Sequence, residues 1–255
     1  YIFKWFNSCK SRCFMKKYSI SAFYPVYNDE GTVEKMSMNL REVLLELTND
    51  YEIIVVDDHS HDKSGEIADK LANKYKEIKV IHHKRNMGYG GALKSGFANA
   101  TKELVFYTDG DAQYDVFELK KLYPYIDKYD VVNGYKIKRS DNWYRKFLGG
   151  IYNFGMRIIF TLKVRDVDCD FRLMKRKIFN SVTLENNSGF ICVEMMKKIQ
   201  NYGYTIKNVP VNHYPRYFGQ SQFFRISKII RVFGNVVRYW IKLVLIWNVK
   251  KLFGK

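Results

Sequence analysis

The chain has 255 residues, of which 47% are hydrophobic and 16% aromatic. This composition suffices for a large buried core and argues against disorder. Four prolines and 16 glycines exclude collagen-like and low-complexity proteins. The four cysteines lack C-x-x-C spacing and indicate neither a disulfide framework nor a zinc site, so we expect a reducing, cytosolic environment: Cys9, Cys13, Cys169 and Cys192.

The net charge of +17 is concentrated at the two ends of the chain. Residues 1–17 carry five Lys or Arg and residues 195–255 carry twelve, and neither segment has an acidic residue. The region between them is neutral. A nucleic-acid-binding protein usually carries its charge on the reading domain, whereas basic ends rich in Phe, Trp, Ile and Val are typical of contact with a membrane surface. We therefore expect a membrane surface as partner and no nucleic acid.

The longest purely apolar run, residues 243–247, is far shorter than the about 20 residues of a transmembrane helix. From Arg225 onward, basic residues at 225, 228, 231, 238 and 242, with Asn235 completing a spacing of three or four, lie opposite apolar residues that include Ile229 and Trp240. This pattern predicts an amphipathic helix at 225–247 lying in a membrane interface. The alternative is a terminal helix packed on its own domain. No secretory signal is visible in residues 1–17.

Between these ends, predicted strands and helices alternate. We expect strands at 18–24, 51–57, 78–82, 103–109 and 130–134, and helices at 29–47, 62–76, 89–100 and 115–128. Such alternation implies right-handed crossovers and a doubly wound, mostly parallel α/β sheet. A further helix at 143–162 is apolar nearly all round, so it either packs in the core or faces lipid. The predicted domains are a basic segment at 1–17, a catalytic domain at 18–224 and an amphipathic tail at 225–255.

Acidic residues follow three predicted strands: Asp29 and Glu30, Asp57 and Asp58, and Asp109 and Asp111. In parallel sheets ligands bind beyond these strand ends. Carboxylates there suit a polyphosphate held through Mg²⁺ or Mn²⁺, which prefer oxygen ligands. D-x-D pairs also arise by chance, and an Asx-turn closing the strand is the alternative at 109–111.

Two other phosphate-binding classes are excluded by the glycine spacing. The first βα turn reads PVYNDE instead of the G-x-G-x-x-G of dinucleotide-binding folds. The glycines at 88, 90 and 91 lack the Lys-Ser/Thr pair of a P-loop.

Seven segments come in a specific order along the chain: PVYNDE (25–30), VDDHSHD (56–62), RNMGYGGAL (85–93), TDGDAQYD (108–115), DVDCDFRLMKR (166–176), GFICVEM (189–195) and VPVNHYPRYFGQSQFF (209–224). In this order and spacing the chain resembles family-2 glycosyltransferases with the GT-A fold. It resembles most closely the dolichyl-/polyprenyl-phosphate sugar synthase branch. The resemblance covers roughly residues 18–224.

The resemblance implies a nucleotide-sugar site made of Pro25, Tyr27, Asp29, Glu30, Val56, Asp58, Asp109 and Gly110. The family usually has Glu directly after Asn28, so the contact of Asp29 can shift to Glu30. The resemblance also implies that Asp109, Asp111 and Gln113 hold the metal and the donor diphosphate. Asp57 has the alternative role of capping the next helix, and Gln113 that of a solvated loop residue.

The acceptor phosphate is expected, from the resemblance, at Lys136, Arg145, Arg216 and Ser221. Arg216, together with the metal held by the catalytic Asp109 and Asp111, would also stabilise charge on the leaving diphosphate. Lys136 stands where relatives often have Arg and offers a point charge instead of a fork. The alternative for Arg216 is that it belongs to the basic tail.

Two further carboxylates, Glu194 and Asp170, are candidate general bases. A sugar hydroxyl acceptor would need a base, whereas a phosphomonoester, with a second pKa of about 6, is already an anion near neutral pH. Glu194 therefore has the alternative role of pairing with Arg172. His213 shows no metal-ligand spacing with the other histidines, and we interpret it as a strand-loop residue.

The resemblance leads us to expect a metal-dependent inverting transferase. It would move one hexose from a UDP- or GDP-hexose to polyprenyl or dolichyl phosphate, peripherally at the cytosolic face of a membrane. A flippase, a membrane subunit or a second copy are further candidate partners. One rival is a transferase that uses a sugar hydroxyl in polysaccharide synthesis, although the Q-x-x-R-W motif of processive synthases is missing. The other is a non-catalytic lipid- or nucleic-acid-binding protein, which the acidic strand ends disfavour because they repel phosphates.

Overall fold

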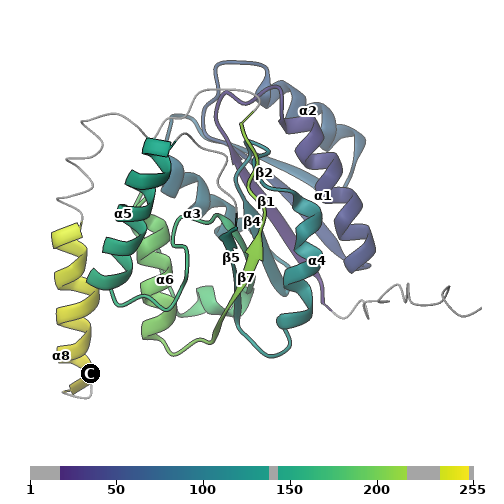
Figure 1. The fold of residues 1–255 in the computed structure, drawn as a ribbon. Helices are drawn as coiled ribbons and strands as arrows, with labels where there is room; N and C mark the ends of the chain where they lie inside the picture. The colour runs from purple at the N-terminus through teal and green to yellow at the C-terminus, as the bar shows by residue number, and fades with distance from the viewer. Residues whose placement is uncertain (1–17, 138–142, 217–235, 253–255) are drawn as a thin grey trace, which may run out of the picture.

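A computed structural model describes residues 18–137, 143–216 and 236–252. Its strands form one seven-stranded sheet in the order β3-β2-β1-β4-β6-β5-β7 (Figure 1). The strands are β1 (Ile20–Val26), β2 (Tyr51–Asp57), β3 (Ile78–His82), β4 (Leu104–Thr108), β5 (Val131–Lys136), β6 (Phe171–Lys175) and β7 (Ile206–Val211). Only β6 runs antiparallel to its neighbours β4 and β5. The predicted mostly parallel α/β sheet is confirmed.

Helices cover both faces of the sheet. α1 (Val33–Leu47), α2 (Ser64–Lys74) and α4 (Leu119–Leu122) lie on one face, and α3 (Tyr89–Asn99) and α6 (Ile191–Asn201) on the other, with α5 (Trp143–Ile159) outside them (Figure 1). The single helix predicted at 115–128 is wrong. This segment forms 3₁₀ turns at Val116–Glu118 and Tyr123–Tyr125 around the short α4, because Pro124 lacks the N–H that a continuous helix needs.

Residues of β1 alternate between two core clusters, one on each face of the sheet. Ala22 and Tyr24 pack beneath α1, whereas Phe23 points to the α3 side, and all three are fully buried. The ring of Phe23 stacks on Tyr107 with 5.5 Å between centroids. α3 can approach this ring because residue 96 is glycine, where an added Cβ would lie 2.3 Å from the Phe23 ring.

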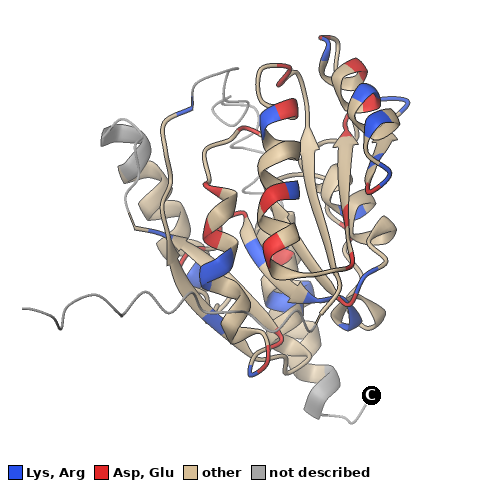
Figure 2. Cartoon of the chain, turned by 90° about the vertical axis from the view of Figure 1, so that its right-hand side faces the viewer, with Lys and Arg blue, Asp and Glu red and all other residues tan. Residues whose placement is uncertain are grey.

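The charged residues on the face formed by α1 and α2 are of both signs (Figure 2). Lys and Arg side chains alternate there with Asp and Glu, and one such pair is Arg41 and Glu77, with 2.7 Å between Nε and Oε1. This face is therefore a mixed, solvated surface and offers no uniform charge to an anionic partner.

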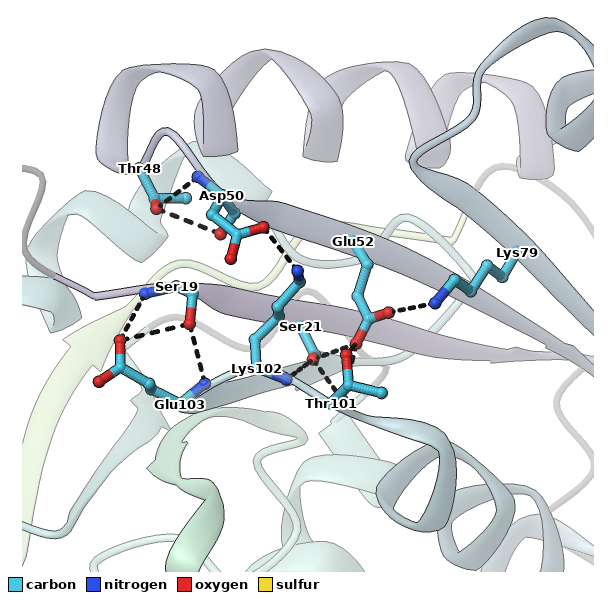
Figure 3. Close-up of polar contacts among 9 residues, drawn as sticks. All are labelled: Ser19, Ser21, Thr48, Asp50, Glu52, Lys79, Thr101, Lys102 and Glu103. Atoms are coloured by element: carbon cyan, nitrogen blue, oxygen red, sulfur yellow. Dashed lines mark hydrogen bonds and ion pairs between the residues drawn. The ribbon is translucent and has the colours of Figure 1, made fainter.

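A buried carboxylate, Glu52 of β2, ties together the edge of the sheet opposite the acidic strand ends (Figure 3). Ser21 Oγ and Thr101 N donate to its Oε1 over 2.6 and 2.7 Å, and Lys79 Nζ donates to its Oε2 over 2.7 Å. Burial alone would raise the pKa of Glu52, but these hydrogen bonds outweigh it and lower the pKa to about 2. Glu52 thus joins β1, β2, β3 and the start of β4.

The described part of the C-terminal segment is helical at 236–252, with a π-helical stretch at Ile241–Ile246 followed by α8 (Trp247–Leu252). Tyr239 and Leu243 are buried in the core cluster on the α6 side, and Asn201 Nδ2 donates to the Leu243 carbonyl over 2.9 Å. Part of the helix therefore packs on its own domain, as the alternative has it, while Val237 is 58% exposed, and the placement in a membrane interface stays a prediction. The rest of the predicted helix lies outside the described residues. None of the described helices has both the length and the hydropathy to cross a membrane.

The network around Glu52 predicts a pH-dependent stability. Because its pKa falls from 4.5 to about 2 on folding, its stabilisation is complete above pH 4.5 and is lost as the pH falls toward 2. Glu52→Gln should remove roughly 2–3 kcal/mol of the free energy of unfolding at pH 7 and flatten its decline below pH 5. Urea unfolding between pH 2.5 and 7 measures both effects. Glu103→Gln, at the same edge but exposed, is the control; a wild-type pH profile in Glu52→Gln would contradict the prediction.

Candidate active site

The loops after β1 and β2 are bound to each other at the acidic edge of the sheet. Asn28 and His59 adopt left-handed backbone conformations that turn both loops sharply. Asn28 Oδ1 accepts from His61 N over 2.7 Å, and Glu30 Oε2 accepts from Lys63 N over 3.0 Å. Glu30 is therefore engaged in holding the two loops together.

Asp29, next to Glu30, faces the other acids of the site. Burial raises its pKa to about 6; the positive charge of Arg216 opposes this shift and the negative charge of Asp111 adds to it. These electrostatic partners place the Asp29 carboxyl beside the loop after β4. Asp29, rather than Glu30, thus faces Asp111 and Arg216, and its contact with a donor stays a prediction.

Asp57 and Asp58, at the end of β2, both hold loops. Asp57 accepts from Ser60 N over 2.9 Å and from His82 Nδ1 over 2.9 Å. It does not cap α2, whose N-cap is Lys63.

Asp58 is 4% exposed and orders the loop that precedes α3. It accepts hydrogen bonds from Met87 N over 2.7 Å and from Gly88 N over 2.9 Å. A third hydrogen bond joins it to His83 Nδ1 over 2.6 Å. Its two oxygens are thus occupied by the chain itself. The predicted contact of Asp58 with a nucleoside stays a prediction.

The loop after β4 is packed tightly on the end of β1. A Cβ added at Gly110 would lie 2.3 Å from the Pro25 carbonyl oxygen, so only glycine fits there. Thr32 Oγ1 donates to the Gly110 carbonyl over 2.7 Å. Pro25 and Gly110, two predicted donor-site residues, therefore fix the position of the aspartates on either side of Gly110.

Asp109 and Asp111 project from this loop toward different partners. Tyr89 Oη donates to Asp109 Oδ1 over 2.7 Å. Asp111 accepts from Gln113 N over 3.1 Å through Oδ1 and from Arg216 Nη2 over 2.6 Å through Oδ2. Arg216 thus neutralises Asp111 directly and belongs to the site, not to a solvated basic tail.

The segment carrying Arg216 is attached to the loop after β4. Tyr214 N donates to the Gln113 carbonyl over 2.8 Å, and Gln113 Nε2 donates back to the Tyr214 carbonyl over 3.0 Å. His213 pairs with Tyr114 through an isolated antiparallel bridge and packs edge-to-face on its ring. Gln113 is therefore a bridging residue, and His213 lies on the strand-loop segment after β7 as expected.

A buried ion pair that sequence reasoning missed lies behind Asp109. Arg172 of β6 is 0% exposed and donates to Asp170 Oδ1 over 3.0 Å and to Asn133 Oδ1 over 2.6 Å. Cys192 Sγ also donates to Asp170 Oδ1, over 3.1 Å. Burial raises the pKa of Asp170 to about 6, although the Cys192 hydrogen bond and the charge of Lys136 oppose this.

The acids of the site shift one another's pKa. Burial raises the pKa of Asp109 well above its ordinary value, and the charges of Asp170 and Asp111 raise it further. A cation bound here would reverse this shift. The described residues contain no group of three or more His, Cys, Asp or Glu side chains placed to hold a metal. Mg²⁺-type ions, however, are commonly held by one or two carboxylates plus substrate phosphates, and the pair Asp109 and Asp111 fits that requirement.

Glu194 is structural, and its predicted pairing with Arg172 is wrong. It is fully buried, accepts from the backbone N–H groups of Glu185 and Asn186 over 3.0 and 2.9 Å, and pairs with Lys198 at 2.7 Å. Gly90 N in turn donates to the Asn187 carbonyl over 2.9 Å. Glu194 thus supports the loop that backs the glycines before α3.

The remaining predicted residues are spread over several places. Val56 is fully buried in the core, so its side chain offers no surface to a nucleoside. Tyr27 is partly buried in the loop after β1. Lys136 ends β5, and its Nζ donates to the Asp168 carbonyl over 2.7 Å. Ser221 and the side chain of Arg145 lie outside the described residues.

A mostly parallel sheet with one antiparallel strand and with aspartates after β4 is the arrangement of the GT-A class of glycosyltransferase fold, to which the structural neighbours reported below also belong. Residues 21–183 match the family model described as Glycosyl transferase family 2. The chain belongs to this family.

Curated relatives are similar over most of this chain. It is 27% identical over 237 residues to Glycosyltransferase AglD of Haloferax volcanii, covering 89% of this chain and 38% of the relative. It is also 27% identical over 209 residues to the undecaprenyl-phosphate 4-deoxy-4-formamido-L-arabinose transferase of Enterobacter sp. (strain 638), covering 81% of this chain and 63% of the relative. The chain thus spans about two fifths to three fifths of their length.

Among solved structures, glucosyl-3-phosphoglycerate synthase of Mycobacterium tuberculosis with phosphoglyceric acid matches with a TM-score of 0.67 and 15% identity, covering 88% of this chain and 79% of that one. A structure of the same protein with Mn²⁺, uridine diphosphate and phosphoglyceric acid matches with a TM-score of 0.65 and 16% identity, covering 90% and 78%. At this identity the likeness establishes the fold.

The buried pair of Asp170 and Arg172 yields a stability prediction. Arg172→Met should lower the free energy of unfolding by about 3–5 kcal/mol, because it leaves a buried carboxylate without its cation. Adding Asp170→Asn should recover part of the loss. Urea unfolding of the wild type and the two variants measures this. A loss below about 1 kcal/mol in Arg172→Met would show that the pair contributes little.

Proposed function

We propose that this glycosyltransferase moves a sugar from a nucleotide diphosphate sugar to a polyprenyl phosphate at the cytosolic face of a membrane, with inversion and with a single hexose as the transferred group. The observation that carries the proposal is the arrangement of Asp109, Asp111 and Arg216 at the carboxyl ends of the strands. The name of the undecaprenyl-phosphate relative supports the acceptor, and the Mn²⁺ and uridine diphosphate of the structural relative support the donor class.

In this proposal Asp109 and Asp111 hold Mg²⁺ or Mn²⁺, which would supply positive charge for the donor diphosphate. Asp29 lines the nucleoside side of the site. Arg216 Nη2 lies 2.6 Å from Asp111 Oδ2. Its guanidinium can exchange this acceptor for an oxygen of the donor diphosphate, and it would then stabilise the charge of the leaving group. We therefore assign Arg216 to the donor side.

The acceptor oxygen attacks the anomeric carbon as the bond to the diphosphate breaks. A phosphomonoester attacks as an anion and needs orientation rather than a base. Asp170 and Glu194, the two candidate bases, are buried and hydrogen-bonded by their own chain. Their engagement favours a phosphate acceptor over the rival sugar hydroxyl.

Radiolabelled nucleotide sugars offered with undecaprenyl phosphate and Mn²⁺ or Mg²⁺ test the function. The expected result is label in the organic phase with at least one UDP- or GDP-hexose. A parallel reaction with 3-phosphoglycerate tests a soluble hydroxyl acceptor. Label only in the aqueous product of that reaction would overturn the proposal.

Metal removal should abolish transfer. Chelation by EDTA, and separately Asp111→Asn, should each lower the transfer rate at least 100-fold, because the diphosphate charge is then uncompensated. Excess Mn²⁺ should restore the wild type but not the variant. Full activity of Asp111→Asn in EDTA would contradict the metal assignment.

Arg216→Ala should lower kcat/KM for the nucleotide sugar about 10- to 150-fold, the equivalent of 1.5–3 kcal/mol for a hydrogen bond to a charged group. Arg216→Lys should recover part of this. Steady-state kinetics with each substrate varied in turn distinguishes the two sides of the site. An effect confined to KM for the lipid phosphate would show that Arg216 binds the acceptor phosphate instead of the donor diphosphate.

Membrane attachment is proposed through exposed apolar side chains of α5, among them Phe154 at 64% and Ile158 at 58% exposure. Phe154→Glu with Ile158→Glu should reduce the fraction bound to anionic liposomes tenfold or more, since burying each side chain contributes about 1.5–3 kcal/mol. Leu45→Glu, at a position on α1 that is 44% exposed and lies across the sheet, is the control. Sedimentation with liposomes measures binding. An equal loss of binding in the double variant and in Leu45→Glu would rule out α5 as the attachment site.

A further inference from the structure

A cationic groove lies between the end of β5 and α5, outside the cluster of Asp109, Asp111 and Arg216. It has a volume of about 610 Å³. Three cations line it, Lys136, Arg157 and Arg165, against one acid, Asp166. An excess of positive charge in a concave site attracts anions.

Arg157 of α5 has an unsatisfied hydrogen-bond donor in this groove. Its Nε is buried and has no hydrogen-bond partner among the described residues. A buried donor without an acceptor is unfavourable, more so when it is charged. An anionic oxygen entering the groove would supply the missing acceptor.

Arg165, which also lines the groove, is held by its neighbours. Its guanidinium lies 4.3 Å from the centre of the Tyr135 ring, which keeps the planar group extended. Asn153 of α5 fixes the backbone that follows it: Nδ2 donates to the Arg165 carbonyl over 3.1 Å, and Oδ1 accepts from Val167 N over 3.0 Å. Arg157 and Arg165 are therefore both positioned from α5.

The groove lies on the acidic side of the sheet. Lys136 lines it and also lowers the pKa of Asp109 and Asp170 through its charge. A phosphate held by these cations would thus be near the carboxylates proposed to bind the donor.

An apolar hollow adjoins the cationic groove along α5. It is lined by Phe147, Ile151 and Phe154, and Gly150 belongs to both. A Cβ added at Gly150 would meet nothing within 4 Å. The two hollows together offer positive charge at one end and aromatic surface at the other, which matches an anionic head with an attached hydrocarbon chain.

We infer that Arg157 and Arg165 bind the phosphate of a prenyl phosphate, and that the chain leaves over Gly150 along the apolar hollow. This assignment rests on the proposed function and adds two residues to its acceptor site. The two arginines offer charge-assisted, fork-like hydrogen bonds to the phosphate oxygens, which Lys136 alone cannot.

Equilibrium binding of farnesyl phosphate to the full chain, without any nucleotide sugar, tests the inference. Arg157→Gln and Arg165→Gln should each weaken binding about tenfold or more, while uridine diphosphate affinity stays within twofold of the wild type. The affinity of Arg157→Lys for farnesyl phosphate should lie between that of the wild type and that of Arg157→Gln. Gly150→Leu should block the groove without a clash inside the protein, and Gly155→Leu, on the same helix and equally unobstructed, is the matched control.

Farnesol and inorganic phosphate identify the part of the ligand that is recognised. Both should bind at least tenfold more weakly than farnesyl phosphate. Inorganic phosphate binding as tightly as farnesyl phosphate would overturn the lipid assignment, and unchanged farnesyl phosphate affinity in both arginine variants would overturn the site. Because no transfer is measured, either result is distinguishable from failure of the proposed function, which the nucleotide-sugar panel reports.

Discussion

Asp109, Asp111 and Asp170 repel one another in a poorly solvated space at the carboxyl ends of the strands, and much of the surrounding structure compensates for this repulsion. Burial and mutual charge raise the pKa of Asp109 and Asp170. Arg172 neutralises Asp170 from inside the sheet, and Arg216 neutralises Asp111 from the segment after β7. The two arginines differ in one respect. Arg172 is fully enclosed and permanently committed, whereas Arg216 is 26% exposed, so a ligand can compete for it.

The antiparallel β6 makes this compensation geometrically feasible. It lies between β4, which carries Asp109 and Asp111 at its end, and β5, which ends at Lys136. Tyr107 of β4 pairs with Arg172 of β6, and its hydroxyl donates to Asp170 over 3.1 Å. A strand inserted in the opposite direction thus brings the 166–170 loop to the same edge as the loop after β4. Donor-side acids and the cationic groove consequently share one wall of the protein.

The sequence predicted those strands whose own residue pattern is enough to specify them. β2 and β3 begin and end where the sequence indicates. β3 lies at the edge of the sheet and is largely half-exposed, whereas β2 is a β-branched run that is buried on both faces. The acids at 109 and 111 were placed at a strand end for the same reason. β6, α6 and β7 were not predicted. β6 contains Arg172 and Lys175 among apolar residues, and the burial of Arg172 depends on Asn133 and Asp170, which are brought to it only by the tertiary fold. The unpartnered Nε of Arg157 likewise has no signature in sequence.

The choice between a phosphate and a hydroxyl acceptor depends on which carboxylates are accessible to act as a base. Glu194 has both oxygens engaged by backbone N–H groups and Lys198, and removing a proton from an incoming hydroxyl would require it to leave a fully buried position. Asp170 accepts from Tyr107, Arg172 and Cys192 through one oxygen. These hydrogen bonds commit that oxygen to groups of the protein itself, although burial still raises the pKa of Asp170 to about 6. A nucleophile that arrives already ionised avoids this conflict, and the arginines of α5 and its following loop are placed to orient one. The carboxylates engaged by their own chain and the arginines that line the groove thus favour the same acceptor chemistry.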